Sequence, residues 1–377
     1  MAKMASSMPN PGHGYIVRES LGRGRWKEVF RAVKRGEFKD HALARFIAKP
    51  TTGALLKELS PLLTIERLRK GAGSQNVARV YDAFEGDDGR IYVAEELLFR
   101  PLTAVSPLRS GDRFFRIAED LSAGLAALHS INLVHRDLKL DNCGVDYRGT
   151  AKIFDLGSAT SEGGEVHGTI LTRAPELFRE GARCSKPSDI WALGALLLAL
   201  RTGDYPYVNG DELRQRPELE EQTKRAAFDG MVKDRILFPG AASTLDSKVR
   251  DAFPSGPREI LEAMLDFDPS VRPSADSLPA KWEQIHQAWM PPQRERDIDP
   301  NEALLKEIKA FLEAVLEKQV GMSTLQWQRT VSEIEPLVND PKYDKALLER
   351  IQKLLEKLSE QRQSAEQRPL PLQSVDT

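Results

Sequence analysis

Two short segments constrain this chain more than any other feature: VHRDLKLDN at residues 134–142 and DLG at residues 155–157. They hold four polar side chains at short, fixed spacings: Asp137, Lys139, Asn142 and Asp155. Metal-assisted phosphoryl transfer needs a carboxylate near the attacking hydroxyl and a lysine for the transferred group. It also needs an amide and a second carboxylate to hold magnesium. The two segments therefore predict this chemistry.

These segments also point to a known family. Over about residues 15–290 the sequence resembles the eukaryotic-type protein kinases. The resemblance implies an α+β, two-lobed protein kinase fold with ATP between the lobes: a small β-rich N-lobe over about residues 15–98 and a larger helical C-lobe over about residues 99–290. The hydrophobic pattern agrees, because short strand-like runs precede Asp112 and longer helical patterns follow it.

The resemblance assigns roles to the four side chains. Asp137 matches the catalytic aspartate that orients the substrate hydroxyl and accepts its proton, and Lys139 matches the phosphate-contacting lysine. Asn142 and Asp155 match the magnesium ligands, so the cofactors implied are ATP and Mg2+. His135 matches a position that packs in the interior, and we expect it to be structural.

Motifs later in the sequence narrow the class of kinase that the chain resembles. Lys139 and Thr169 match the serine/threonine pattern, in which the threonine packs against the catalytic aspartate and lysine. Asp189 matches an anchor of the catalytic loop, and Arg272 matches the ion-pair partner of Glu176 in the APE motif. Antibiotic and choline kinases generally lack these later motifs, so that alternative is disfavoured. The function implied is transfer of the γ-phosphoryl of Mg-ATP to Ser/Thr hydroxyls of protein substrates, including autophosphorylation.

The segment LGRGRWKEVF resembles the glycine-rich loop of the family. Gly22 and Gly24 would let backbone amides approach the ATP phosphates, and Val29 matches the residue that covers adenine. Lys27 stands where the third glycine is expected. The loop is recognisable, but this departure predicts a different contact with the nucleotide.

The strand lysine and its helical partner are less well defined. In ARFIAKP, Lys49 matches the lysine that contacts the α- and β-phosphates. Its glutamate partner should lie on the following helix, where the spacing favours Glu66 and leaves Glu58 as the alternative.

The segment RIYVAEELL resembles the strand that leads into the adenine-binding hinge. The backbone from Glu96 to Leu98 would hydrogen-bond adenine. Glu95 then occupies the gatekeeper position, which is normally apolar. Either the register differs by one residue or the back of the nucleotide site is unusually polar.

Composition changes outside the kinase-like region. We expect a flexible N-terminus over residues 1–14, a polar, Pro-rich linker over 291–300, and a flexible C-terminus over 363–377. Between linker and C-terminus, residues 301–362 carry apolar residues at helical spacing and predict a helical tail of two or three helices. Such a tail could pack as a local bundle, bind a protein partner or self-associate.

Bulk properties exclude several classes. The 54 basic and 56 acidic residues give a net charge of −2, so we expect neither nucleic acid nor a membrane surface as partner. The two cysteines stand neither in a CxxC motif nor in a histidine-rich segment, so we expect neither disulfides nor a zinc site. No signal peptide or membrane span is predicted, and a cytoplasmic location is the simplest expectation.

Regulation is open at this stage. Arg136 matches an arginine that usually pairs with a phosphorylated loop residue, and we hypothesise that Glu165 supplies a fixed negative charge in its place. Ser158, Thr160 and Ser161 are candidate autophosphorylation sites. A pseudokinase scaffold is the alternative from another functional class, because Lys27 and Glu95 depart from the family pattern.

Overall fold

The computed structural model describes residues 9–23, 27–36, 40–46, 74–108, 110–146, 148–214, 222–238, 240–289, 309 and 348–357. The chain divides into two compact units: Met1–Asp146 with Thr150–Met290, and Tyr147–Gly149 with Pro291–Thr377. The predicted boundaries of lobes, linker and tail remain predictions at the residue level.

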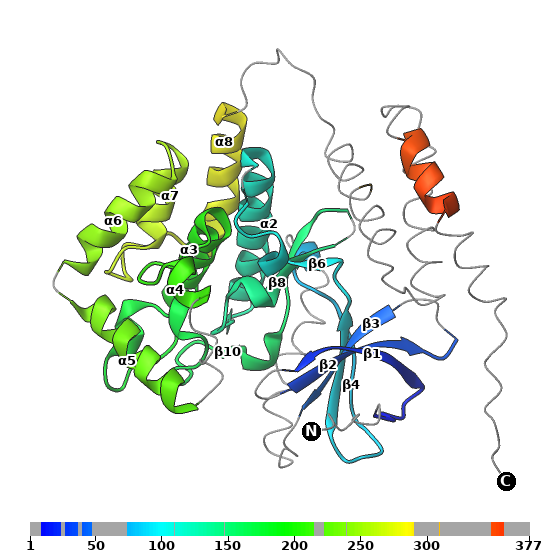
Figure 1. Cartoon of the computed structure of the whole chain (residues 1–377). Coiled ribbons are helices and arrows are strands. Elements are labelled where there is room, and N and C mark those ends of the chain that lie inside the picture. The colour runs from blue at the N-terminus through cyan, green and yellow to red at the C-terminus, as the bar shows by residue number, and fades with distance from the viewer. Residues whose placement is uncertain are drawn as a thin grey trace, which may run out of the picture. The chain divides into compact units, whose positions relative to one another are not determined.

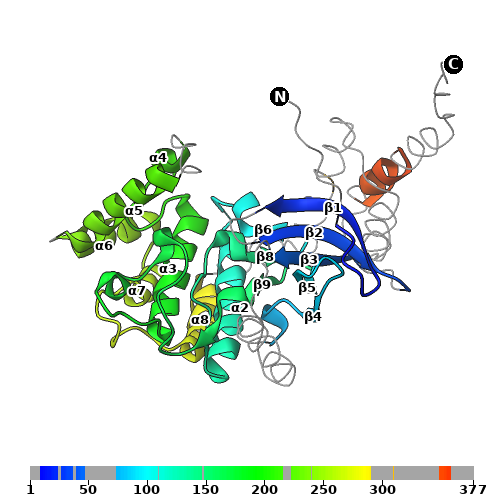
Figure 2. The same ribbon diagram turned by 90° about the horizontal axis from the view of Figure 1, so that it is seen from below.

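The first part of the larger unit is a five-stranded antiparallel sheet with the strand order β1-β2-β3-β5-β4. Its strands lie on one side of the unit, away from α3–α7 (Figure 1, Figure 2). The predicted strand segments thus form one sheet. The bounds are β1 Tyr15–Arg23, β2 Lys27–Lys34, β3 Asp40–Phe46, β4 Val80–Glu85 and β5 Ile91–Glu96.

The two faces of this sheet carry different side chains, because successive residues of a strand point to opposite faces. One face is packed with a cluster of apolar and aromatic residues: Tyr15, Ala32, Leu43, Phe84, Tyr92 and Ala94. The opposite face, here called the inner face, follows from the pairing of β2 with β3 and of β3 with β5. It carries Lys27, Val29, Ala44, Phe46, Val93 and Glu95.

The second part of the larger unit is mainly helical. Its core is one continuous apolar cluster that runs from α2 through α3 to α8. The predicted two-lobed kinase fold, small and β-rich before large and helical, is therefore confirmed. The helices are α2 Gly111–Ser130, α3 Lys186–Thr202, α4 Gly210–Arg214, α5 Gln222–Leu237, α6 Ala241–Ala252, α7 Pro257–Met264 and α8 Leu278–Trp289.

Helix α3 is the centre of this core. Every residue from Ser188 to Leu200 is buried, as its Ala- and Leu-rich sequence requires. The helix begins at a capping box in which Ser185 and Ser188 satisfy each other's backbone N–H groups. It ends at Gly203, whose positive φ of 82° suits a glycine C-cap. A buried, well-capped helix provides a rigid support for the loops packed on it.

Two small sheets carry the loops of the site. Strands β6 Arg100–Pro101, β8 Cys143–Val145 and β9 Ala151–Ile153 form one of them, and β7 Leu133–Val134 pairs with β10 Thr160–Ser161 in the other. The β8–β9 hairpin brings the ends of both sequence motifs together. Directly beyond it, the Phe154 N–H donates to the Asn142 carbonyl at 2.9 Å.

Of the smaller unit the structure describes residues 148–149, 309 and 348–357, and the last of these stretches is helical. Leu348 and Ile351, two apolar residues of the predicted tail, are buried. In the described part of the chain, no helix has the length and apolar character that crossing a membrane requires.

Candidate active site

Residues 135–142, here called the HRD loop, are held by a buried carboxylate at the start of α3. Asp189 accepts hydrogen bonds from the backbone N–H of His135 at 2.7 Å and from that of Arg136 at 3.0 Å. His129, at the end of α2, lies 3.1 Å from the same carboxylate. The predicted anchoring role of Asp189 is confirmed, and it fixes the loop to both central helices.

His135 is a structural element of the loop. Its Nδ1 accepts the backbone N–H of Asp137 at 3.2 Å, so Nε2 carries the proton and donates to the Phe154 carbonyl, also at 3.2 Å. The residue has no exposed surface. Because both ring nitrogens are engaged, His135 is not free to act as a base, and its predicted structural role is confirmed.

Asp137 lies at the centre of a hydrogen-bond network. Thr169 donates both its backbone N–H and its hydroxyl to Asp137 Oδ1 at 2.8 Å, and Lys139 Nζ lies 2.9 Å from Oδ2. Lys139 also donates to Thr169 Oγ1 at 3.1 Å, which confirms the predicted packing of this threonine. Burial acts to raise the pKa of Asp137, but Lys139 and the Thr169 hydrogen bond outweigh it and lower the pKa. Asp137 is therefore ionised at neutral pH.

Asn142 is oriented by the same loop. Its Nδ2 donates to the Asp137 carbonyl at 2.8 Å and to Asp137 Oδ2 at 3.1 Å, which leaves the amide oxygen available. The β8–β9 hairpin places Asp155 near it along the backbone. An amide oxygen and a carboxylate are hard oxygen donors, and this donor chemistry fits Mg2+.

A close backbone approach fixes the threonine segment. Gly168 has a φ of +91°, and a Cβ at this position would lie 2.1 Å from the Arg136 carbonyl oxygen. Only glycine allows that approach. Gly168 is therefore what lets Thr169 reach Asp137, although no sequence motif singled out this glycine.

The hypothesis that Glu165 supplies a fixed charge needs correction. Arg136 donates Nη1 to the backbone carbonyl of Glu165 at 3.0 Å, and Nε to the carbonyl of Ser158. Among the described residues, the Glu165 carboxylate forms no ion pair with Arg136. A backbone acceptor does not depend on the residue type, so the negative charge of Glu165 is not what holds Arg136.

The predicted pair of Glu176 and Arg272 is confirmed. Arg272 donates Nη1 and Nη2 to the two carboxylate oxygens of Glu176 at 2.7 and 2.8 Å. It also donates to the Pro187 carbonyl at 2.9 Å and stacks over the ring of Trp191. The arginine side chain has no exposed surface. This pair ties the segment after Thr169 to the start of α3.

The inner face of the sheet contributes an unexpected contact. Lys27 Nζ lies 2.5 Å from Asp155 Oδ1, and about a fifth of each side chain is exposed. Lys27 pairs across the sheet with Phe46, the last residue of β3. The Phe46 ring in turn lies beside Gly157, 3.7 Å from where a Cβ of that glycine would be. The sheet thus meets the DLG segment through Lys27 and Phe46.

Glu95 is buried on the inner face and points the same way as Lys27. Burial raises its pKa to about 7, while the charge of Lys27 opposes this rise and that of Asp155 adds to it. Of the two alternatives left by the sequence, the register places Glu95 on the inner face, with Val93 two residues before it. That side of the site is therefore polar.

The structure describes some of the remaining candidate residues for nucleotide binding, and others lie outside the described residues. Gly22 pairs with Val29 across β1 and β2. The Glu96 side chain is paired with Lys152 at 2.8 Å, and its backbone N–H donates to the Arg79 carbonyl at 2.7 Å, so its own carbonyl is the part that could meet adenine. Leu98 follows β5 and packs against Gly144. Four candidates lie outside the described residues: Gly24, Lys49, Glu58 and Glu66.

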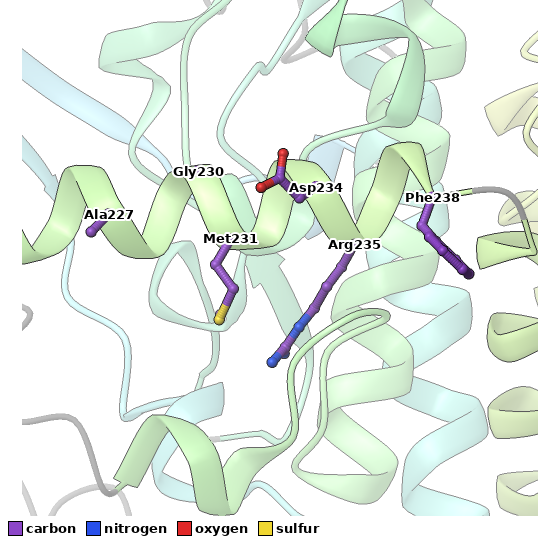
Figure 3. Close-up of a pocket in the computed structure, with 6 residues that line it drawn as sticks. All are labelled: Ala227, Gly230, Met231, Asp234, Arg235 and Phe238. Carbon is purple, nitrogen blue, oxygen red and sulfur yellow. The ribbon is translucent and has the colours of Figure 1, made fainter.

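A separate open hollow of about 530 Å³ lies along α5 (Figure 3). It shares no residue with the network around Asp137, so it is not the site of the predicted phosphoryl transfer. Its lining residues are Ala227, Gly230, Met231, Asp234, Arg235 and Phe238.

Comparison with known proteins agrees with this geometry. The family model described as "Protein kinase domain" matches residues 15–290. The chain belongs to the protein kinase family.

Individual relatives are distant. A calcium/calmodulin-dependent serine/threonine-protein kinase of Malus domestica is 30% identical over 54% of this chain and 47% of its own length. The probable serine/threonine-protein kinase MARK-B of Dictyostelium discoideum is 26% identical over 81% of this chain and 40% of its own. Mitogen-activated protein kinase p38b of Drosophila melanogaster is 26% identical over 70% of this chain and 77% of its own. The chain thus spans less than half the length of the first two relatives.

Proposed function

We propose that this chain is an active serine/threonine protein kinase, which transfers the γ-phosphoryl of Mg-ATP to Ser/Thr hydroxyls of protein substrates and of itself. The observation that carries the proposal is the network of Asp137, Lys139 and Thr169. It combines an ionised carboxylate, a cation and a fixed threonine at hydrogen-bond distances of 2.8–3.1 Å. These are the groups that phosphoryl transfer to a hydroxyl requires.

Each group has a defined part. Asp137 accepts the hydrogen bond of the incoming hydroxyl and then its proton, and its lowered pKa keeps it ionised to do so. Lys139 lies beside it and offsets negative charge on the transferred phosphoryl. Thr169 holds both in place through its hydroxyl and backbone N–H. Because all three are prearranged, little reorganisation accompanies the reaction.

Asn142 and Asp155 would hold the magnesium ion, which supplies charge neutralisation on the phosphates when bound. On the sheet side, Gly22 and Gly24 would border the phosphates, Val29 would cover adenine, and the Glu96–Leu98 backbone would hydrogen-bond it. The sequence prediction assigns the phosphate-contacting pair to Lys49 and Glu66, which both lie outside the described residues.

The finer partner and location assignments are proposals too. We infer a cytoplasmic enzyme that acts on proteins, with neither nucleic acid nor a membrane as partner. The tail could bind a protein partner. Self-association through it has less support, since Leu348 and Ile351 are already buried in the single chain.

The test is transfer of labelled γ-phosphate from Mg-ATP to the chain itself and to a generic basic protein, followed by analysis of the phosphorylated residues. Label on serine and threonine that disappears when magnesium is chelated supports the proposal. A folded protein that binds ATP but transfers nothing would instead favour the pseudokinase scaffold, for which Lys27 and Glu95 are the supporting departures.

A further inference from the structure

Among the described residues, the cation that pairs with the carboxylate of the DLG segment lies on β2. Lys27 reaches Asp155 at 2.5 Å from the second strand of the sheet. Among the residues the structure describes, it is the one cation that forms an ion pair with Asp155. Asp155 is also one of the two oxygen donors suited to magnesium, so Lys27 stands where the phosphates of a nucleotide would lie.

The described part of β3 offers no competing cation at this place. Its residues on the inner face are Asp40, Ala42, Ala44 and Phe46, as the pairing with β2 and β5 shows, and none of them is a cation. Arg45 points to the other face, where it binds Glu28 through Nε at 3.1 Å. At the position opposite Lys27, β3 presents the ring of Phe46, which packs beside Gly157.

A second cation on the inner face of β2 is already engaged. Arg31 lies four residues along the strand and pairs with Glu19 at 2.9 Å. Lys27, in contrast, faces Asp155 directly and lies on the same face of the sheet as Glu95. The charge of the Lys27 ammonium becomes available to a polyphosphate when a metal ion occupies the Asp155 carboxylate.

We propose that Lys27 is the lysine that binds the α- and β-phosphates of the nucleoside triphosphate, and that Phe46 fills the place on β3 where a lysine would otherwise stand. The assignment rests on the proposed kinase function for its biological meaning. It explains why a lysine replaces the third glycine of the loop: the long side chain crosses the space that a glycine would leave open.

Chemical labelling tests the assignment without requiring phosphoryl transfer. An ATP derivative with an acyl group on its γ-phosphate acylates lysines beside the phosphates: Nζ attacks the acyl carbon, an amide forms, ATP leaves, and the proton goes to solvent. We expect label on Lys27, prevented by excess ATP, when peptides of the full chain are examined by mass spectrometry. Label on Lys49 with none on Lys27 would overturn the proposal.

Substitution supplies an independent readout. Lys27→Met should weaken Mg-ATP affinity about 10-fold or more, as loss of a charge-assisted hydrogen bond predicts, and slow phosphoryl transfer about 100-fold or more. The matched control is Lys34→Met, which removes a lysine of the same strand that pairs with Asp82 at 3.0 Å. It should leave ATP affinity unchanged. Unchanged ATP affinity in Lys27→Met would contradict the proposal.

A rescue variant tests whether misfolding, rather than loss of the ammonium, causes the fall in ATP affinity. Because Lys27 and Phe46 are direct partners across the sheet, the double variant Lys27→Gly with Phe46→Lys returns an ammonium to the same place from the other strand. It should recover part of the ATP affinity lost in Lys27→Gly alone. If the chain binds ATP through Lys27 yet transfers no phosphate, the kinase function fails while the lysine assignment stands.

Discussion

The HRD loop and the inner face of the sheet meet at one site but follow the family pattern to different degrees. Around the loop, residues expected from the sequence make the contacts expected of them: Asp189 binds the loop backbone and Thr169 binds Asp137. On the inner face, three positions differ: Lys27 stands at a glycine position, Glu95 at an apolar one, and Phe46 at the place opposite Lys27. Under the proposed assignment of Lys27, the groups that react with the substrate keep their family positions, whereas the phosphate-binding cation comes from a neighbouring strand.

The physical reason lies in how each region is held. The loop is fixed by a chain of buried hydrogen bonds in which each partner has one geometry. The inner face is a pleated sheet, where cross-strand partners such as Lys27 and Phe46 lie side by side. A long side chain on either strand reaches nearly the same point. The following substitutions test this contrast.

The largest expected loss of stability comes from breaking the ion pair of Arg272 with Glu176. Arg272→Ala would leave Glu176 without its partner beside a buried helix, and removing one member of a buried ion pair costs about 3–5 kcal/mol. Chemical denaturation measures the change. The control is Arg116→Ala, which breaks the exposed pair with Asp112 and should cost under about 1 kcal/mol. Equal losses of unfolding free energy in the two variants would contradict the proposed role of the Arg272–Glu176 pair in supporting the site.

Gly168→Ala tests the close approach of the threonine segment to the HRD loop. Its Cβ would overlap the Arg136 carbonyl and displace Thr169 from Asp137, and a shift of about 1 Å can cost about 100-fold in rate. Gly163→Ala is the matched control, because φ there is +88° but nothing lies within 4 Å of the added Cβ. Phosphoryl-transfer rates of both variants, compared at saturating ATP, check this. A rate for Gly168→Ala equal to that of the control would refute the positioning role.

The variant Glu95→Gln tests the polar character of the inner face through the pH dependence of stability. The raised pKa, about 7 against an ordinary 4.5, means that the folded chain binds a proton more tightly than the unfolded chain. Stability from this carboxyl is therefore full at low pH and falls as pH rises toward 7. Between pH 5 and pH 8 the wild type should lose up to about 3 kcal/mol relative to Glu95→Gln, measured by urea unfolding without nucleotide.

Glu28→Gln, on the opposite face, is the control for this pH series. The hydrogen bond from Arg45 lowers the pKa of Glu28 despite its burial, and nearby arginine charges add to the effect. Its contribution is present above the ordinary pKa and is lost only in more acidic solution. The cost of Glu28→Gln should therefore stay constant between pH 5 and pH 8. Parallel pH profiles for wild type and Glu95→Gln would contradict the polar inner face.

The smallest expected effect is at the activation segment. Glu165→Ala should change the transfer rate by less than about 2-fold, a negligible free-energy difference, because Arg136 binds the backbone carbonyl that the variant retains. Arg136→Ala removes both of its carbonyl contacts and should be clearly slower. A large loss in Glu165→Ala would restore the fixed-charge hypothesis.

Much of the loop could be predicted from sequence because its residues are contiguous or belong to recognisable motifs. The roles of Asp189 and Arg272 followed from such motifs, and the contacts agree. The role of Lys27 could not be assigned from a motif, because it depends on which residue of β3 lies opposite Lys27 in the sheet. The signal available was the lysine in GRWK and the alternation of Ala42, Ala44 and Phe46.

Glu165 shows a second limit of sequence reasoning. Spacing placed it near Arg136, and the structure does bring the two residues together. Sequence does not reveal whether a side chain or a backbone carbonyl makes the contact. Gly168 was missed for a similar reason, since only the three-dimensional structure shows that a Cβ there would lie 2.1 Å from the Arg136 carbonyl oxygen.

The most direct test of the catalytic site compares two aspartates of one loop. Asp137→Asn removes the carboxylate bound by Thr169 and Lys139, whereas Asp141→Asn makes the same chemical change at an exposed position four residues along. Steady-state phosphoryl transfer and ATP affinity are measured for both variants and the wild type. We predict that Asp137→Asn retains ATP affinity but loses transfer by about 100-fold or more, while Asp141→Asn transfers like the wild type. Equal transfer by Asp137→Asn and the wild type would contradict the proposed active site.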